Sequence, residues 1–243
     1  MQDLIDNISI WIKEEIEKAG KDGVVLGLSG GLDSTITAFL CKQALGQEKV
    51  LGIIMPCHPN PNVSEDTKLS VEFLKIPTKY IDLTPAYDVF LSILPEGNKT
   101  SHSNLKVRLR MATLYYFANK FNYLVAGTSN KSEYNVGYFT KYGDGAVDLM
   151  PIADIYKTEL FKLAEYINVP KKIIDKPPSA DLWEGQTDEK ELGITYEKLD
   201  NALKNLLENK KPANSAQEKL VEKMIKESVH KKILPPIFKR KNN

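Results

Sequence analysis

Cysteine and histidine are scarce in this chain, which has 2 cysteines and 3 histidines among 243 residues. Cys41 and Cys57 stand apart, so neither a zinc site nor a disulfide framework is expected, and a reducing cytoplasm fits. No apolar run approaches the roughly 20 residues that a membrane-spanning helix needs. Residues 1–20 mix apolar side chains with acids and lysines, which is typical of an amphipathic helix rather than a signal peptide. We therefore expect a cytoplasmic protein with no membrane partner.

A surplus of charge of either sign is also missing, because 33 basic residues stand against 32 acidic ones. Proteins that bind nucleic acid usually carry a basic surface, so the charge balance predicts no nucleic-acid partner. The length is sufficient to bury the core of one α/β domain. We expect residues 1–243 to form a single domain.

Strands and helices alternate along the first half of the chain. The expected strands are 24–29, 49–55, 78–83 and 123–127, and the expected helices include 2–19, 33–45, 64–75 and one capped by Asn104. This alternation predicts a doubly wound, mainly parallel α/β sheet flanked by helices, which is Rossmann-like, followed by a helical C-terminal part. Residues 129–150 and 176–193 are expected to be long functional loops.

The most informative stretch joins the first strand to the next helix through Ser29-Gly30-Gly31-Leu32-Asp33-Ser34. Such a turn leaves backbone N–H groups free to bind phosphate, and glycine lets the backbone approach the anion. The order of residues is neither the Walker loop nor the dinucleotide fingerprint. Asp33 beside a phosphate suggests an intervening cation, so the loop predicts Mg²⁺. This loop resembles that of the ATP pyrophosphatases, which cleave ATP between its α and β phosphates.

A second polar segment follows the strand expected at 123–127. Thr128 ends that strand, and Glu133 follows five residues later. Ligands of such sheets bind beyond the carboxyl ends of the strands, so both polar segments are expected in one crevice. Two carboxylates that share Mg²⁺ with triphosphate oxygens are a common arrangement, which makes Asp33 and Glu133 the candidate metal ligands.

Residues 139–148 match the pattern Phe-Thr-Lys-Tyr/Phe-Gly-Asp-Gly-x-x-Asp of the ammonia-dependent NAD synthetases, and the chain resembles that family over most of its length. Further similar segments are 104–111, 176–182 and His230-Lys231. The chain departs from the family at Ser129-Asn130, where many relatives have Asp-His, and at Ser179, where many have threonine. Neither departure removes a charged ligand.

The resemblance implies roles for individual residues. Asp33, Glu133 and Lys157 would be catalytic. The implied ATP contacts are Gly27, Leu28, Ser29, Gly30, Gly31, Leu32, Asp33, Ser34, Thr128, Lys157 and Ser179. The implied contacts of deamido-NAD are Arg108, Arg110, Phe139, Lys141, Asp148, His230 and Lys231.

Two of these implied contacts compete with each other. Residues two apart do not share a helix face, so one of Arg108 and Arg110 is expected to enter the site. Arg110 is favoured because Arg108 lies closer to the apolar stripe of its helix. The ring of Phe139 is expected to stack on the pyridine of the substrate.

The implied reaction is the ATP-dependent amidation of deamido-NAD by ammonia, which gives NAD, AMP and pyrophosphate through an acyl adenylate. The enzyme would be a C–N bond-forming ligase and a homodimer. Glutamine-using relatives carry a separate amidase domain for which 243 residues leave no room, so free ammonia is the expected nitrogen source. Another ATP pyrophosphatase, either tRNA-modifying or GMP-forming, is one alternative, and a non-catalytic adenine-nucleotide sensor is another. The missing cysteine pairs, the 139–148 match and the second carboxylate favour the synthetase.

Overall fold

Four parallel strands form the sheet of this protein in the order β3-β2-β1-β4. The computed structural model describes residues 1–58, 61–183 and 185–240, with the backbone alone at 61–64. The strands are β1 Gly23–Gly27, β2 Val50–Ile54, β3 Thr78–Tyr80 and β4 Tyr123–Val125. The chain runs outward from β1 to β3 and then returns to the other side of β1. The expected doubly wound sheet is confirmed, and its order reverses between β1 and β4.

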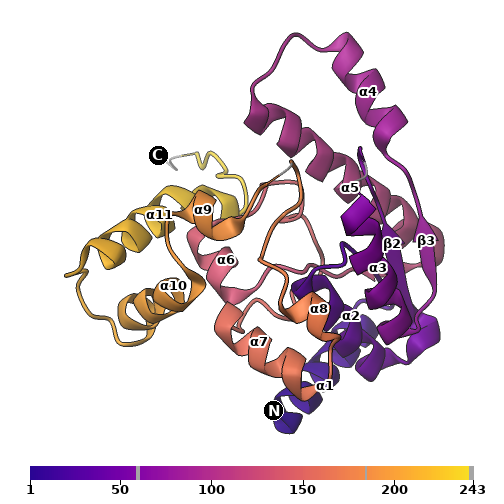
Figure 1. Ribbon diagram of the computed structural model, residues 1–243, viewed down its shortest axis with the longest axis horizontal. Coiled ribbons are helices and arrows are strands. Elements are labelled where there is room, and N and C mark those ends of the chain that lie inside the picture. The colour runs from indigo at the N-terminus through magenta and orange to yellow at the C-terminus, as the bar shows by residue number, and fades with distance from the viewer. Residues whose placement is uncertain (59–60, 184, 241–243) are drawn as a thin grey trace.

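Helices cover both faces of the sheet (Figure 1). One face carries α2 Leu32–Leu45, which packs against α1 Gln2–Lys18 and α7 Lys157–Tyr166. The other face carries α5 Lys99–Phe121, next to α4 Thr84–Ile93. Apolar side chains fill both layers, and fully burying one such side chain contributes about 1.5–3 kcal/mol. Examples are Leu26, Ile36 and Leu40 on the first face and Val25 and Val125 on the second.

Two helices begin earlier than the sequence predicts. The helix expected from Asn104 is α5, which begins at Lys99 with Asn98 as its cap. Asn98 accepts a hydrogen bond from the Ser101 N–H at 2.9 Å, and the Ser101 hydroxyl oxygen accepts one from the Asn98 N–H at 3.0 Å. This reciprocal pair satisfies two N–H groups that would otherwise be free. The helix expected at 64–75 is α3, Pro61–Leu74.

The C-terminal part is helical, as expected, and surrounds a core of its own. It contains α9 Asp188–Leu192, α10 Tyr196–Leu203 and α11 Ala216–Lys232, packed against α6 Lys131–Val136. Figure 1 shows α10 and α11 to one side of the sheet layer. The expectation of unbroken loops at 129–150 and 176–193 is wrong in part, because α6 and α9 lie within them. Helices of five or six residues are too short to show a clear hydrophobic period.

Candidate active site

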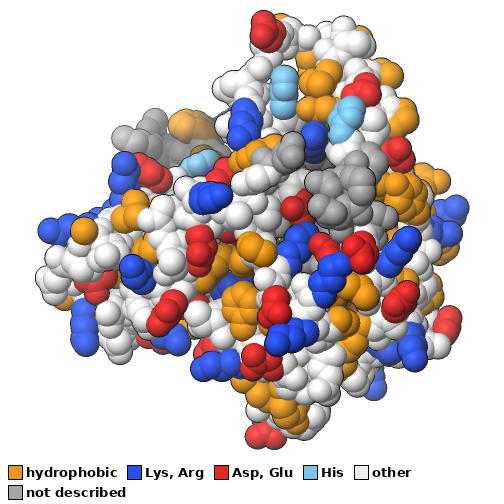
Figure 2. Space-filling view, in the orientation of Figure 1, with side chains coloured by type: hydrophobic (Ala, Val, Ile, Leu, Met, Phe, Trp, Pro, Cys, Tyr) orange, Lys and Arg blue, Asp and Glu red, His pale blue; other side chains and the backbone are white. Residues whose placement is uncertain are grey.

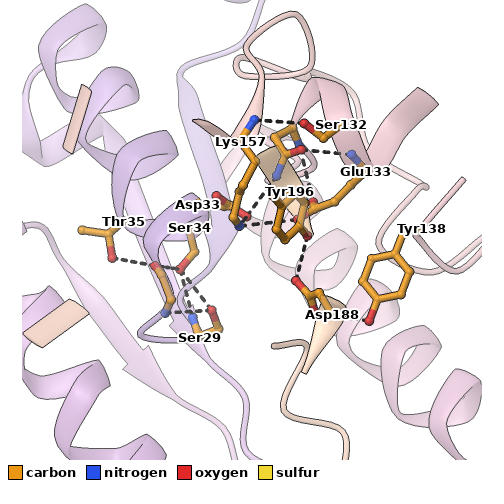
Figure 3. Close-up of polar contacts among 12 residues, drawn as sticks. Ser29, Asp33, Ser34, Thr35, Ser132, Glu133, Tyr138, Lys157, Asp188 and Tyr196 are labelled. Atoms are coloured by element: carbon orange, nitrogen blue, oxygen red, sulfur yellow. Dashed lines mark hydrogen bonds and ion pairs between the residues drawn. The ribbon is translucent and has the colours of Figure 1, made fainter. Parts of the chain in front are cut away.

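The loop from Ser29 to Ser34 lies where β1 ends and α2 begins (Figure 3). Gly30 has φ +80°, and a Cβ there would come within 2.6 Å of the Thr67 backbone nitrogen of α3. Only glycine fits, because the backbone is left-handed and α3 is in close contact. The close contact holds the loop against α3.

Two serine hydroxyls brace this loop from within. The Ser29 oxygen accepts a hydrogen bond from the Gly31 N–H at 3.2 Å, and the Ser34 hydroxyl donates to the Gly31 carbonyl at 3.0 Å. The two hydroxyl oxygens lie 3.1 Å apart. The loop is therefore ordered at the N-terminus of α2, where backbone dipoles favour an anion.

A cluster of charged side chains adjoins the loop (Figure 3). The Lys157 ammonium lies 2.6 Å from Asp33 Oδ2 and 3.5 Å from Glu133 Oε1. Lys157 is 3% exposed, and Glu133 is also buried. Asn130 donates to Asp33 Oδ2 at 3.3 Å and caps α6, so this departure from the family pattern still contacts Asp33. The cluster joins α2, α6 and α7.

The cluster has more carboxylates than ammonium groups, and the pKa values of its side chains are shifted. Burial raises the pKa of Glu133, the Asp33 charge raises it further, and Lys157 opposes both. Burial lowers the pKa of Lys157, but Asp33 and Glu133 outweigh burial and the ammonium pKa lies above its ordinary value. One ammonium therefore serves two carboxylates, of which Glu133 is buried and Asp33 is partly exposed. Asp33 Oδ1 is buried with no hydrogen-bond partner among the described residues, so the cluster has room for another positive charge.

Tyrosines and a third acid extend the cluster, and the sequence did not single them out. The Tyr196 hydroxyl lies 3.0 Å from Glu133 Oε1 and 2.9 Å from Asp188 Oδ2. The Tyr138 hydroxyl lies 3.1 Å from Asp188 Oδ1. Burial raises the pKa of Asp188, while Lys157 and the two tyrosines lower it. The sequence signal that could have identified Asp188 and Tyr196 is that they are an acid and a tyrosine among the apolar residues of the 188–200 segment.

One cavity brings together most of the residues expected to contact ATP. Those that line it are Ser29, Gly31, Leu32, Asp33, Ser34, Thr128, Lys157 and Ser179, together with the second acid, Glu133. Gly27, Leu28 and Gly30 shape the loop without lining the cavity. Asp144, from the 139–148 block, and Asp188 also line it. The expectation that the two polar segments share one crevice agrees with this geometry.

None of the seven residues expected to contact deamido-NAD lines this cavity. Four of them join the end of α11 to the loop after α6. Lys141 Nζ donates to the His230 carbonyl at 2.5 Å, and Lys231 Nζ donates to the Phe139 carbonyl at 2.9 Å. These contacts keep the four near one another, and their role in substrate binding stays a prediction.

The two arginines of α5 diverge. Arg108 donates to the Lys141 carbonyl at 3.2 Å, whereas Arg110 donates to the Met55 carbonyl, beyond the end of β2, at 3.2 Å. They occupy different faces of the helix, as their spacing requires. Which of them contacts substrate stays a prediction.

Phe139 and Asp148 have partners within the fold. The Phe139 ring is buried and stacks on Tyr134 with centroids 5.9 Å apart. Asp148 accepts from the Val125 N–H at 2.8 Å and from the Tyr115 hydroxyl at 3.1 Å. In this conformation both side chains hold the 139–148 loop to its neighbours, and their substrate contacts stay predictions.

Comparison with known proteins identifies the family of the chain. The NAD synthase family model matches residues 4–243. The chain belongs to the NAD synthase family. The NH3-dependent NAD+ synthetase of Methanocaldococcus jannaschii is 51% identical, and the match covers 97% of this chain and 96% of that protein. That of Archaeoglobus fulgidus is 48% identical, with 96% and 95% covered. The NAD synthase family thus accounts for nearly the whole chain.

Solved structures show the same fold. An NMN synthetase from Francisella tularensis superposes with a TM-score of 0.89 at 35% identity, covering 97% of each chain. An NH3-dependent NAD synthetase from Campylobacter jejuni gives 0.85 at 32% identity, covering 98% of this chain and 99% of that one. Membership of the NAD synthase family makes the chain an enzyme of NAD biosynthesis, a ligase that forms a C–N bond. Among the described residues, no helix is long and apolar enough to cross a membrane.

Proposed function

We propose that the chain converts deamido-NAD, ATP and ammonia into NAD, AMP and pyrophosphate through an acyl adenylate. The observation that carries the proposal is that one cavity is lined by the Ser29–Ser34 loop, which includes Asp33, together with Glu133 and Lys157. Relatives of 45–51% identity that carry the name NH3-dependent NAD+ synthetase support ammonia as the nitrogen source and ATP as the co-substrate.

Magnesium fits the residues of this cavity. Asp33 Oδ1 is a buried carboxylate oxygen with no hydrogen-bond partner in the described part of the chain. The negative charges of Asp33 and Glu133 together exceed the single positive charge of Lys157. Among the described residues no group of three or more acids, histidines or cysteines is placed to hold a metal. Mg²⁺ needs no such group, because it is commonly held by one or two carboxylates, water and substrate phosphates. Asp33 and Glu133 would hold it, and it would neutralise charge on the triphosphate.

The first chemical step needs alignment rather than a protein nucleophile. A substrate carboxylate oxygen attacks the α-phosphorus, and the bond to the pyrophosphate oxygen breaks. The N-terminus of α2 and its loop would bind phosphate oxygens, and Lys157 would stabilise the negative charge that develops on the leaving group. Burial of Lys157 strengthens that electrostatic contribution.

The second step replaces the activated oxygen with nitrogen. Ammonia attacks the acyl carbon, the bond from that carbon to the AMP oxygen breaks, and the surplus proton leaves to a base or to water. The cavity walls, which include Pro178 and Phe161, would limit the access of bulk water that competes with ammonia.

A coupled assay tests the reaction. Purified protein with ATP, Mg²⁺, deamido-NAD and ammonium should form NAD and AMP in equal amounts. The Asp33→Ala variant should lose pyrophosphate release by a factor of about 10² or more, because positioning and charge stabilisation are both removed. Near-normal pyrophosphate release by that variant, at an unchanged melting temperature, would refute the metal assignment.

The substrate arm of the same assay should include nicotinate mononucleotide. The likeness to the Francisella tularensis NMN synthetase makes it the informative competitor, since it carries the same reacting carboxylate. We expect a higher kcat/KM with deamido-NAD. A preference for the mononucleotide would move the proposal to that substrate while leaving the chemistry intact.

We also propose that the enzyme is a homodimer. Helix α4 exposes Val89, Phe90 and Ile93, and Figure 1 shows α4 standing out from the sheet layer. Contiguous exposed apolar side chains often mark an interface. Sedimentation equilibrium should give twice the 27.4 kDa chain mass, and Phe90→Glu should shift the protein towards one chain mass. A monomeric parent protein would contradict the dimer.

A further inference from the structure

Asp200 is a buried acid that contacts no basic side chain within hydrogen-bonding or ion-pair distance among the described residues. It lies on α10 and is 2% exposed. Its two oxygens accept hydrogen bonds at the starts of two other helices. The Ser132 hydroxyl of α6 donates to Oδ1, and the Thr158 N–H of α7 donates to Oδ2 at 3.0 Å. A buried carboxylate is costly unless its oxygens are satisfied, so this placement calls for an explanation.

The two contacts of Asp200 adjoin the two charged residues that meet at Asp33. Ser132 directly precedes Glu133, and Thr158 directly follows Lys157. The Lys157 N–H also donates to the Ser132 oxygen at 2.9 Å. One carboxylate is therefore bonded to the α7 backbone directly at Thr158, and through the Ser132 hydroxyl of α6 at Lys157.

The charge of Asp200 suits the position. Its Oδ2 faces the N-terminus of α7, a helix of 10 residues whose first N–H groups have no partner within the helix. A negative charge is favourable there. Asp200 thus fixes the direction in which α7 begins, and Lys157 is the first residue of that helix.

The same helix makes a second contact with the cluster one turn earlier. Tyr196, four residues before Asp200, lies with its hydroxyl 3.0 Å from Glu133 Oε1, and its ring lies below the Lys157 ammonium at 5.2 Å. Residues four apart share a helix face. One face of α10 therefore contacts both charged residues, while Leu199 and Leu203 of the same helix lie in the C-terminal core.

We propose that Asp200 is a positioning residue of the ligase: it sets the place of Lys157 relative to Glu133 and Asp33. It acts through the Ser132 side chain of α6 and the backbone N–H groups of α7, and it does not line the substrate cavity. The proposal rests on the proposed function for its kinetic consequence only, because the position of the Lys157 ammonium can be observed without any substrate.

The test variant is Asp200→Asn, which keeps the shape but can accept only on one side. One of the two donors, the Ser132 hydroxyl or the Thr158 N–H, then loses its acceptor. We expect kcat for pyrophosphate release to fall by roughly ten- to a hundredfold, because small misplacements of reacting groups have effects of that size. The KM for ATP should change by less than about threefold, since the loss falls mainly on the transition state.

Ser132→Ala provides a second route to the same link. It removes the hydroxyl between Asp200 and the Lys157 N–H while the bond from Thr158 remains, and it leaves the helix starts otherwise intact. The double variant should be less impaired than the product of the two single effects, because both act through one connection. If Asp200→Asn does not fold, the kcat of Ser132→Ala decides alone, and an unchanged value overturns the proposal.

Glu218→Gln is the matched control. Glu218 also accepts hydrogen bonds at a helix start, from the N–H groups of Asn214 and Ser215, in the same C-terminal part of the chain. It does not line the cavity. This variant should lose stability and keep its kcat. Equal loss of kcat in Glu218→Gln and Asp200→Asn would show that general loosening of the C-terminal part is the cause, and would overturn the proposal.

Crystal structures of the parent and of Asp200→Asn, without nucleotide, give the readout that does not depend on substrate. In the parent, Lys157 Nζ should lie at about the 2.6 Å contact with Asp33 Oδ2. In the variant this contact should be broken. An unmoved Lys157, or a kcat within about twofold of the parent, overturns the positioning role. A parent inactive on both pyridine substrates would instead refute the proposed function, and the crystal structures would still decide the role of Asp200.

Discussion

Buried carboxylates outnumber the ammonium groups at the centre of the site. Because of this imbalance, Glu133 and Lys157 have opposite effects on the stability of the ligand-free protein. Glu133 is the acid that Lys157 serves less well, because the ammonium lies closer to Asp33. Burial and the Asp33 charge both raise the pKa of Glu133. In the protein without ligand, a charge on Glu133 is therefore unfavourable, and its proposed role in binding the metal would place stability and activity in conflict.

We expect Glu133→Gln to raise the melting temperature of the ligand-free protein by a few degrees at pH 8, because it removes one buried charge and keeps the shape. Lys157→Met should lower the melting temperature, because it leaves two carboxylates without a counter-ion. Both variants should lose pyrophosphate release. Differential scanning calorimetry without Mg²⁺ or ATP measures the first two effects. A destabilised Glu133→Gln variant would show that this carboxylate is well compensated in the free enzyme.

Among single residues, the sequence predicts those whose surroundings are formed by neighbouring segments of the chain. Asp33 sits in a contiguous motif, and the strand before it and the helix after it define its environment. Tyr196 and Asp200 gave no comparable signal, because polar residues in an amphipathic helix usually face water. Their partners, Glu133 and Ser132, lie in a distant segment, and only the packing of α10 against α6 brings them into contact.

Helix starts, rather than helix lengths, determine the geometry of the elements around the site. Helix α6 has only six residues, yet its start is fixed by the hydrogen bonds between Asn130 and Glu133. Helix α11 is held in the same way by Ser215 and Glu218. These caps were difficult to predict, because Asn and Ser are frequent in loops as well as at helix starts. The strands were easier to predict, since their apolar runs are continuous.

The start of α11 makes stability depend on pH in a known direction. Backbone N–H groups of Ser215 and Asn214 hold the pKa of Glu218 at about 2, below the value of about 4.3 for an unfolded chain. The group therefore contributes stability above the unfolded pKa, and this contribution is lost as the pH falls towards the folded one. The melting temperature of Glu218→Gln should lie below that of the parent at pH 6, and the gap should narrow between about pH 5 and pH 2. A gap that stays constant would contradict the role of the charge.

At the scale of the whole molecule, the chain corresponds to part of the larger synthetases. It matches 46% of the glutamine-dependent NAD+ synthetase of Acinetobacter baumannii, at 26% identity and a TM-score of 0.69. Both cysteines are buried and free, and burial raises the pKa of each thiol. A thiol held neutral in this way is a poor nucleophile for releasing ammonia from glutamine.

Purified protein given glutamine, with ammonium carefully removed, should therefore form no NAD above background, whereas ammonium should restore turnover. An enzymatic ammonia assay on the glutamine stock controls for contamination. Cys57→Ser serves as a further check, because it should leave the ammonium-driven rate unchanged. Sustained turnover with glutamine that is abolished in Cys57→Ser would show that this chain hydrolyses glutamine.

The sheet topology was predictable at this scale, because alternating strands and helices with right-handed crossovers leave few arrangements. The arrangement of α9, α10 and α11 was not, since three helices can pack against a sheet domain in many ways. Figure 2 shows acidic and basic side chains interspersed over one face of the molecule. Charge pattern therefore gave no indication of where the C-terminal part would dock.

The link between Asp200 and the start of α7 has a further consequence for how the enzyme is made. A ribosome delivers the Ser29–Ser34 loop early and α10 late, so the nucleotide loop exists long before the helix that aligns its charged neighbours. A nascent chain that has formed only the sheet would present the loop without an ordered Lys157. Productive turnover therefore waits until α10 has been synthesised, and a prematurely released fragment that folds its sheet but lacks α10 would be a poor consumer of ATP.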